Sequence, residues 1–185
     1  MATGFNLAHL QVGAKTATPT FSDINLASTF DPSVDQDSQT LRGDGRIGVT
    51  TYSSREGTGS ITFGSVKLST VGLMTGDEFS TDGVAGTDLI DRLDISGATT
   101  PPSLIFAAWV YNVDRNFDWA GQRITVTNAS VSVPTASYEQ ESWTEYEASL
   151  TFSDNEDGVM MIWETMEVAP TFTAGVIPVA LTPPV

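Results

Sequence analysis

Apolar and polar residues alternate along much of the second half of the chain, and a period of two residues is typical of a β-strand with one buried face. The alternation is cleanest in residues 144–152, and residues 159–164 resume an apolar run after the acidic turn at 154–158. We therefore expect these two segments to pair as a β-hairpin. Residues 124–133 alternate in the same way, with a bend near Asn128.

The most apolar stretch, residues 104–111, follows two consecutive prolines. Its aromatic and aliphatic residues fill both alternating positions, which is typical of a strand buried on both faces rather than of a helix. Residues 47–52 and 60–63 are rich in β-branched and aromatic side chains and predict two further strands. Residues 89–95 favour a strand over a helical turn.

One helix is predicted at about residues 66–75, where apolar residues recur at helical spacing. Ser65 is suited to cap its N-terminus, and Gly76 is suited to end it in a left-handed conformation. A helix of about two to three turns is too short to be stable alone in water, so it must pack on the sheet.

Several segments lack a clear period. Residues 1–22 are compatible with a strand at 5–12 or with an extended arm, and both alternatives stay open. Residues 41–59 carry glycines and charged residues and predict a loop region. The polar residues 31–37 and 77–87 predict loops for the same reason.

These elements together predict an all-β fold, an antiparallel β-sandwich or barrel with one short flanking α-helix and extended terminal arms. The domain would span residues 23–168, preceded by residues 1–22 as an N-terminal segment or arm. Residues 169–185 contain four prolines and would follow as an extended tail.

Charge narrows the functional classes. The 185 residues include 8 Lys and Arg against 23 Asp and Glu, a formal net charge of −15. Proteins that hold phosphates or anionic membranes need cations, so sequence-independent DNA binding and membrane adhesion are disfavoured. Acidity also serves solubility alone, so a surface that repels nucleic acid needs a second, independent argument.

Three absences exclude further classes. Without cysteine the chain has no disulfide, thiolate nucleophile or zinc–thiolate site. The first residues lack the basic and apolar segments of a secretory signal, and no run is long enough to cross a bilayer. We expect a soluble protein that is made in a cytoplasm and binds no cofactor.

No catalytic or metal-binding motif stands out, so we expect a protein that is not an enzyme. His9 is the single histidine, without the partners of a metal site or the Gly-x-Ser-x-Gly elbow of a Ser-His-Asp hydrolase. The acidic turn at 154–158 lacks the ligand spacing of a calcium loop, and we interpret it as a solvated turn. Asp31, Asp35 and Asp37 receive the same interpretation as parts of a polar loop.

Phosphate and sugar sites are equally poorly supported. The glycines at positions 43 and 45 lack the lysine and the strand-to-helix setting of a phosphate loop. Trp109 and Trp163 lie in apolar strands and are expected in the core. Trp119 and Trp143 are then the pair available for a sugar-stacking platform.

The functional prediction rests on the order of several sequence segments along the chain. Residues 42–76 read Arg-Gly-Asp-Gly-Arg, then Ser-Arg-Glu-Gly-Thr-Gly-Ser-Ile-Thr-Phe, then Val-Gly-Leu-Met-Thr-Gly. Two prolines then lead into the strand at 104–110, and an acidic hairpin formed by 146–152 and 159–163 closes the series. Over about two thirds of the chain this order resembles the major tail tube proteins of long-tailed, siphovirus-type bacteriophages.

The resemblance implies a structural role. Members of that family fold as a β-sandwich flanked by a helix, form hexameric rings and stack into a tube through which genomic DNA leaves the capsid. For this chain it implies a virion protein of the tail, made in the host cytoplasm, that self-assembles. Tape measure and tail terminator proteins would be its partners, and DNA would pass through the lumen without specific binding.

The resemblance also indicates which residues make contacts. Loops and arms bridge neighbouring subunits in this family, which points here to residues 1–22, 41–59 and 169–185. Five charged residues of the middle segment are the candidates for subunit contact: Arg42, Asp44, Arg46, Arg55 and Glu56.

The resemblance also supports the interpretation that the negative charge of the chain repels nucleic acid. A ring of six copies would carry a formal charge of −90, six times −15. Acidic residues lining the channel would repel phosphates, so lumen strands should expose Asp or Glu and almost no Lys or Arg. The candidate lumen residues are Asp91, Asp94, Glu139, Glu141 and Glu145.

Two other functions stay open. A capsid decoration or head-tail joining protein would form trimers or single rings rather than stacks. A carbohydrate-binding β-sandwich would require exposed tryptophans in a row.

Overall fold

The computed structural model describes residues 5–24, 26–43, 46–52, 55–64, 66–112, 120–136 and 145–167. Within these residues the chain is all-β with one short helix, as the sequence predicts. The elements are β1 (Phe5–Ala14), β2 (Phe21–Asp23), β3 (Ala27–Asp35), β4 (Ser38–Gly43), β5 (Arg46–Tyr52), β6 (Glu56–Phe63), α1 (Leu68–Thr75), β7 (Glu78–Asp82), β8 (Ile90–Asp94), β9 (Leu104–Asn112), β10 (Gly121–Val131), β11 (Thr135–Ala136), β12 (Tyr146–Phe152) and β13 (Met161–Met166).

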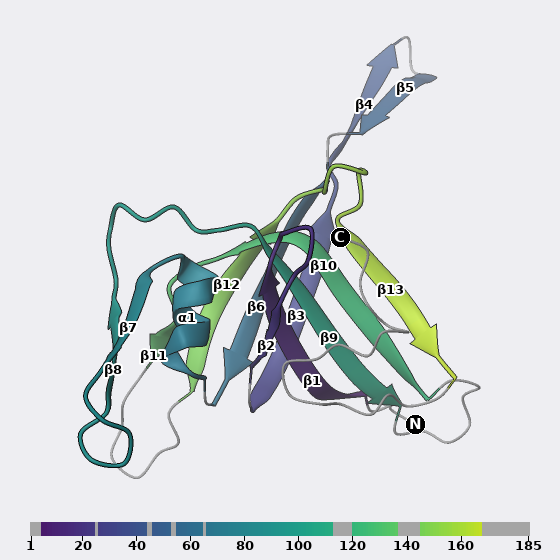
Figure 1. Ribbon diagram of the computed structural model, residues 1–185. Helices are drawn as coiled ribbons and strands as arrows, with labels where there is room; N and C mark the ends of the chain where they lie inside the picture. The colour runs from purple at the N-terminus through teal and green to yellow at the C-terminus, as the bar shows by residue number, and fades with distance from the viewer. Residues whose placement is uncertain are drawn as a thin grey trace.

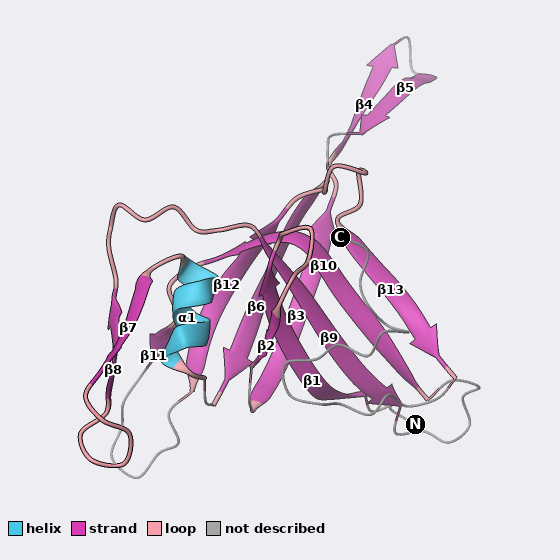
Figure 2. Ribbon diagram, viewed as in Figure 1, coloured by secondary structure: helices cyan, strands magenta, loops and turns pink. Residues whose placement is uncertain are grey.

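Nine strands form one antiparallel sheet (Figure 1). Its main path runs β2-β1-β9-β10-β12-β6-β3, with β11 paired to β12 and β13 paired to β10. The strands β4–β5 and β7–β8 form two separate hairpins that project from different sides of the molecule (Figure 2).

The core lies on the inner face of the curled main sheet. Side chains from strands as distant in the sheet as β1 and β6 meet in one cluster, so the sheet curls around them. The fully buried members of that cluster are Leu10, Val12, Ile61, Phe63, Met74, Leu104, Phe106, Ala108 and Val126. A sheet that encloses its own core belongs to the predicted sandwich or barrel class.

The helix agrees with its prediction and starts slightly later. It begins at Leu68, and Lys67 stands at the N-cap without a side-chain hydrogen bond. Gly76 ends it with φ of 79°, and its N–H donates to the carbonyl of Gly72 at 2.8 Å. The helix packs Val71 and Met74 into the core, which gives so short a helix the tertiary support it needs.

Strand β9 confirms the prediction of burial on both faces. Phe106 and Ala108 point into the main core, whereas Ile105, Ala107 and Trp109 belong to a second cluster on the other face. Its neighbour β10 confirms the predicted bend, because the pairing with β9 shifts between Val126 and Ala129.

The predicted pairing of the last two strands is wrong. Strand β12 buries Ala148, Leu150 and Phe152 as its alternation predicts, but it does not pair with β13. Both strands lie along the same edge of β10, with β12 opposite residues 129–131 and β13 opposite residues 121–126. The eleven-residue β10 is long enough to hold both.

Of the two alternatives left open for residues 1–22, the structure shows the strand rather than the arm for the residues that it describes. Strand β1 lies between β2 and β9, and its Leu10 and Val12 are fully buried. The strand alternative at 5–12 was therefore correct. The tail predicted for residues 169–185 lies outside the described residues.

Three predicted loops contain strands. Residues 31–35 belong to β3, where Pro32 is tolerated because β3 is an edge of the sheet. The region 41–59, predicted as a loop region around the strand at 47–52, contains that strand as β5 together with the end of β4 and the start of β6. Residues 78–82 form β7, which pairs with the correctly predicted strand β8.

Candidate functional site

The outer face of β3, β6, β12 and the end of β10 is covered by hydroxyl and carboxyl side chains. These residues alternate with the buried ones along each strand, so all of them point away from the core. We call this surface the hydroxyl–carboxylate face. Its residues, all exposed or half-buried, are Asp31, Ser33, Asp35, Glu56, Thr58, Ser60, Thr62, Ser130, Ser132, Glu147, Ser149 and Thr151.

The strand register places these side chains in rows across the sheet. Thr151 lies opposite Thr58, which lies opposite Ser33, and the Ser33 Oγ and Thr58 Oγ1 atoms are 3.3 Å apart. On the other side of Thr151, its Oγ1 lies 2.8 Å from Ser130 Oγ. The hydroxyl groups thus satisfy one another across neighbouring strands.

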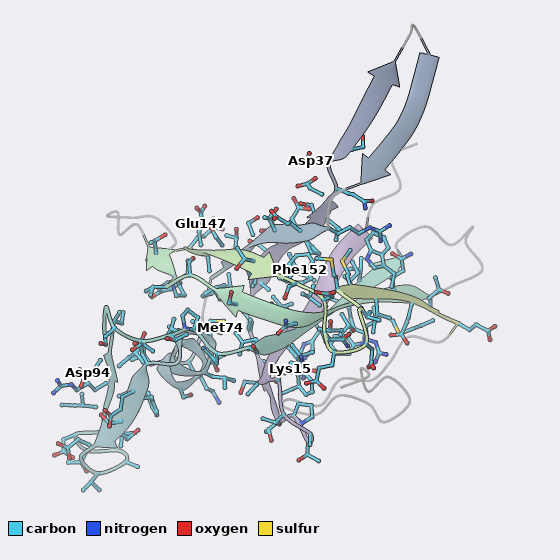
Figure 3. All side chains as sticks on the ribbon, turned by 90° about the horizontal axis from the view of Figure 1, so that it is seen from above. Lys15, Asp37, Met74, Asp94, Glu147 and Phe152 are labelled. Atoms are coloured by element: carbon cyan, nitrogen blue, oxygen red, sulfur yellow. The ribbon has the colours of Figure 1, made fainter. Side chains whose placement is uncertain are left out.

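The charges on this face are all negative. Its four carboxylates are Asp31, Asp35, Glu56 and Glu147, and none of its twelve residues is Lys or Arg. Figure 3 shows Glu147 on the outer side of β12. A polyanion brought against these twelve side chains meets no cation among them that could replace its counterions, and Arg55, which precedes Glu56, lies at the margin of the face.

The acidic residues predicted to line the lumen fall into three groups. Glu145 is exposed and immediately precedes β12, next to the hydroxyl–carboxylate face. Asp91 and Asp94 lie on β8 of a projecting hairpin instead. Glu139 and Glu141 lie outside the described residues.

Each β8 acid is bound to a neighbour. Asp91 Oδ1 accepts a hydrogen bond from Thr81 Oγ1 at 3.1 Å, and Asp94 Oδ1 accepts one from Arg92 Nε at 2.7 Å. This hydrogen bond, together with the charge of Asp94, raises the pKa of Arg92 above its ordinary value.

At the base of the same hairpin, Asp77 holds the following loop. Its Oδ1 accepts the N–H of Ser96 at 3.1 Å. That backbone hydrogen bond, followed by those from the hydroxyl groups of Thr75 and Thr99, lowers the pKa of Asp77. The carboxylate is therefore stabilised in its charged form and fixes where β8 leaves the hairpin.

The predicted contact residues belong to the other hairpin and its base. Arg42 is in β4, Arg46 begins β5, and Asp44 lies outside the described residues. Arg55 Nε donates to Gln36 Oε1 at 3.4 Å, and Glu56 lies opposite Asp35 at the start of β6. Four of the five thus flank or form one projecting hairpin.

On the other half of the outer face, the side chains over β1, β9 and the first part of β10 are buried. Arg123 is 1% exposed, and its guanidinium binds Glu164, with Nε 2.6 Å from Glu164 Oε2. Asp23 Oδ1 accepts a hydrogen bond from Gln11 Nε2 at 2.6 Å and lies 3.0 Å from His9 Nε2. Trp109 lies between these two groups, since β9 pairs it with both His9 and Arg123.

Sequence reasoning missed this buried polar half. A charged residue such as Arg123 in an alternating strand is normally interpreted as facing solvent. Within the part of the chain that the structure describes, no three His, Cys, Asp or Glu side chains gather as a metal site requires. The buried polar groups form one ion pair, Arg123 with Glu164, and the hydrogen bond from Gln11 to Asp23.

The tryptophans divide between core and surface. Trp109 is fully buried as predicted, but Trp163 is 59% exposed, so its predicted core position is wrong. It lies on β13 beyond the point where β12 ends, opposite Ile124 of β10. Trp119 and Trp143 lie outside the described residues.

No protein-family model matches the chain, and a search of curated proteins returned no similar sequence. No helix among the described residues is long and apolar enough to span a membrane.

Proposed function

We propose that this protein is a structural subunit of a phage tail tube, which self-assembles into hexameric rings that stack around a channel for DNA. The hydroxyl–carboxylate face would line that channel. The observation that carries the proposal is this face itself, with twelve hydroxyl or carboxyl residues and not one cation.

The chemistry of the face suits a conduit for a polyanion. Four carboxylates on each copy give 24 in a ring of six, four times six. Phosphates are repelled by these charges, while the hydroxyl groups offer water-like contacts without a fixed cation to hold the DNA. DNA would therefore pass without binding at specific positions.

The two projecting hairpins suit assembly. Each extends beyond the main sheet and is not part of it, so both are available for contacts between copies. Charged residues at β3, including Asp31 and Asp35, would discourage premature pairing of that sheet edge in the free subunit.

Electron microscopy of the purified protein tests the assembly. At rising concentration, negative staining should show hollow tubes or stacked sixfold rings. Closed trimers or single rings that never stack would contradict the proposal and favour a capsid decoration or head-tail joining protein. Failure to assemble even when added to purified tail-tip complexes would contradict it as well.

Lysine substitutions test the channel. The double variant Asp31→Lys/Glu147→Lys should assemble but slow or abort DNA ejection, because the channel would then hold phosphates. A matched control, Glu156→Lys/Asp157→Lys, makes the same charge change in the exposed turn after β12 and should eject normally. Normal ejection by the face variant would refute a channel position. Loss of assembly by the face variant alone would place the face between subunits instead.

A further inference from the structure

The turn that joins β7 to β8 begins with an Asp-Gly pair (Figure 1). Asp82 is the last residue of β7, Gly83 follows it, and both are exposed to solvent. A second Asp-Gly pair, Asp157 and Gly158, lies in the exposed turn after β12. Both pairs are followed by valine, so the two turns share the sequence Asp-Gly-Val and can be compared directly.

Asp-Gly pairs can rearrange without an enzyme. The backbone nitrogen of the glycine forms a bond to the aspartate Cγ, the bond from Cγ to the hydroxyl of the neutral carboxyl group breaks, and the amide proton leaves with that hydroxyl as water. The product is a cyclic succinimide. Water then opens the ring, either at Cγ, which restores aspartate, or at the backbone carbonyl carbon, which gives isoaspartate. Glycine favours this reaction because it has no Cβ to hinder the approach.

The structure holds the two reacting groups of the first pair together. Gly83 N–H donates a hydrogen bond to Asp82 Oδ1, and the nitrogen and oxygen are 2.8 Å apart. The nitrogen therefore lies beside Cγ, the carbon that carries this oxygen. Reacting groups that the fold already holds in contact react much faster than groups that must first meet.

The rest of the turn maintains this arrangement. Asp88 Oδ1 accepts the N–H of Val84 at 2.8 Å, and Asp88 N–H donates to the Val84 carbonyl at 3.1 Å. Gly83 has φ of 89°, and an added Cβ would lie 2.3 Å from the Asp88 carbonyl oxygen. The turn therefore requires the same glycine that makes Asp82 labile.

The amide of the second pair is directed elsewhere. Gly158 N–H donates to the Asn155 carbonyl at 3.0 Å. Asn155 Oδ1 in turn accepts the N–H groups of Asp157 at 3.0 Å and Val159 at 2.9 Å. Gly158 must break its hydrogen bond to Asn155 before its nitrogen can attack the Asp157 carboxyl group.

We propose that Asp82 is a site of spontaneous isomerisation to isoaspartate in the folded protein, and that the turn around Asn155 protects Asp157 from the same reaction. Isoaspartate adds one methylene group to the main chain at position 82. That position is the last pair of the β7–β8 ladder, opposite Ile90, so the pairing of Phe79 with Leu93 is retained. The reaction needs only solvent water, and it occurs whether or not copies of the chain assemble into a tube.

Ageing of the purified, full-length protein provides the first test. The folded protein is kept for weeks at mildly acidic pH, which favours the neutral carboxyl group, and is then digested. Chromatography with electron-transfer fragmentation distinguishes isoaspartate from aspartate, although their masses are equal. Isoaspartate should accumulate at least about fivefold faster at position 82 than at position 157, and a smaller ratio overturns the inference.

Ageing in urea separates the effect of the fold from that of the sequence. The unfolded chain holds neither amide in place, so the ratio of the two rates should fall toward one. A ratio that stays at its folded value would assign the difference to neighbouring residues and overturn the role of the two turns.

Asparagine substitutions give a second readout, because the same attack on asparagine expels ammonia and changes the mass. Folded Asp82→Asn should lose ammonia at least about fivefold faster than folded Asp157→Asn, and similar rates overturn the inference. The control Asp82→Glu would require a larger ring and should form no isomer at this position. Circular dichroism checks that each variant is folded, and if one is not, ageing of the unmodified protein decides.

Discussion

One sheet carries two very different outer surfaces. Over β3, β6 and β12 the outward side chains are hydroxyl and carboxyl groups exposed to solvent. Over β1, β9 and the first part of β10 they are Gln11, Trp109, Arg123 and Thr125, each at most 1% exposed. The boundary runs along β10, whose Ser130 belongs to the first half and whose Thr125 belongs to the second.

The difference shows what burial demands of a polar residue. On the exposed half, Ser and Thr need only water or each other. On the buried half, the guanidinium of Arg123 requires the carboxylate of Glu164, and Asp23 requires Gln11 and His9. Single replacements on the first half should therefore cost little stability, whereas single replacements on the second half should cost much more.

The largest difference is expected at Trp109. Its replacement by Ala removes the largest fully buried side chain and should lower the free energy of unfolding by roughly 3–5 kcal/mol. The matched change Thr58→Ala on the exposed half should stay within about 0.5 kcal/mol. Urea unfolding measures both. A cost below about 1 kcal/mol for the tryptophan would show that this half is open in solution.

An intermediate effect is expected beneath the exposed half. A Cβ on Gly57 would lie 2.2 Å from the ring of Phe152, so Gly57→Ala should cost about 1–3 kcal/mol through overpacking. Phe152→Leu should relieve that clash, and the double variant should lose less stability than the two single changes added together. Additive losses in the unfolding measurement would contradict the contact.

The smallest difference in stability between the two halves is expected for two glutamates. Glu164→Gln leaves the buried Arg123 charge without its counter-charge, while Glu164 itself is 39% exposed by its side chain, so the cost should be about 1–2 kcal/mol. Glu147→Gln on the hydroxyl–carboxylate face should change stability by less than about 0.5 kcal/mol. Equal effects in thermal unfolding would remove the distinction between the two halves.

Sequence patterns were sufficient to predict which face of a strand is buried, but not which strands pair with each other. The alternation at 146–152 predicted which side chains of β12 are buried, and the continuous apolar run predicted the two buried faces of β9. Neither pattern encodes which strand pairs with which, because register depends on contacts between distant segments. The pairing of β13 with β10 was therefore missed.

The prediction was wrong where amino-acid composition was given more weight than the alternation of apolar and polar residues. In β3, Phe30, Pro32 and Val34 alternate with acids and a serine, yet the aspartates and the proline indicated a loop. The burial of Arg123 was not predicted at all, because it depends on the tertiary fold. The predicted roles of Arg42, Arg46 and the lumen acids stay predictions until assembly and ejection are measured.

Because β12 and β13 share one edge of β10, the turn between them can also accept inserted residues. Strands β12 and β13 behave as one strand interrupted by residues 153–160, and both ends of the interruption are bound to β10. Ser153 N–H donates to the Asn128 carbonyl, and Thr127 N–H donates to the Met160 carbonyl. Because each flank has its own register, the exposed turn between them can lengthen without shifting either strand. An inserted peptide there would be displayed once on every subunit, at a regular spacing in any assembly that this chain forms.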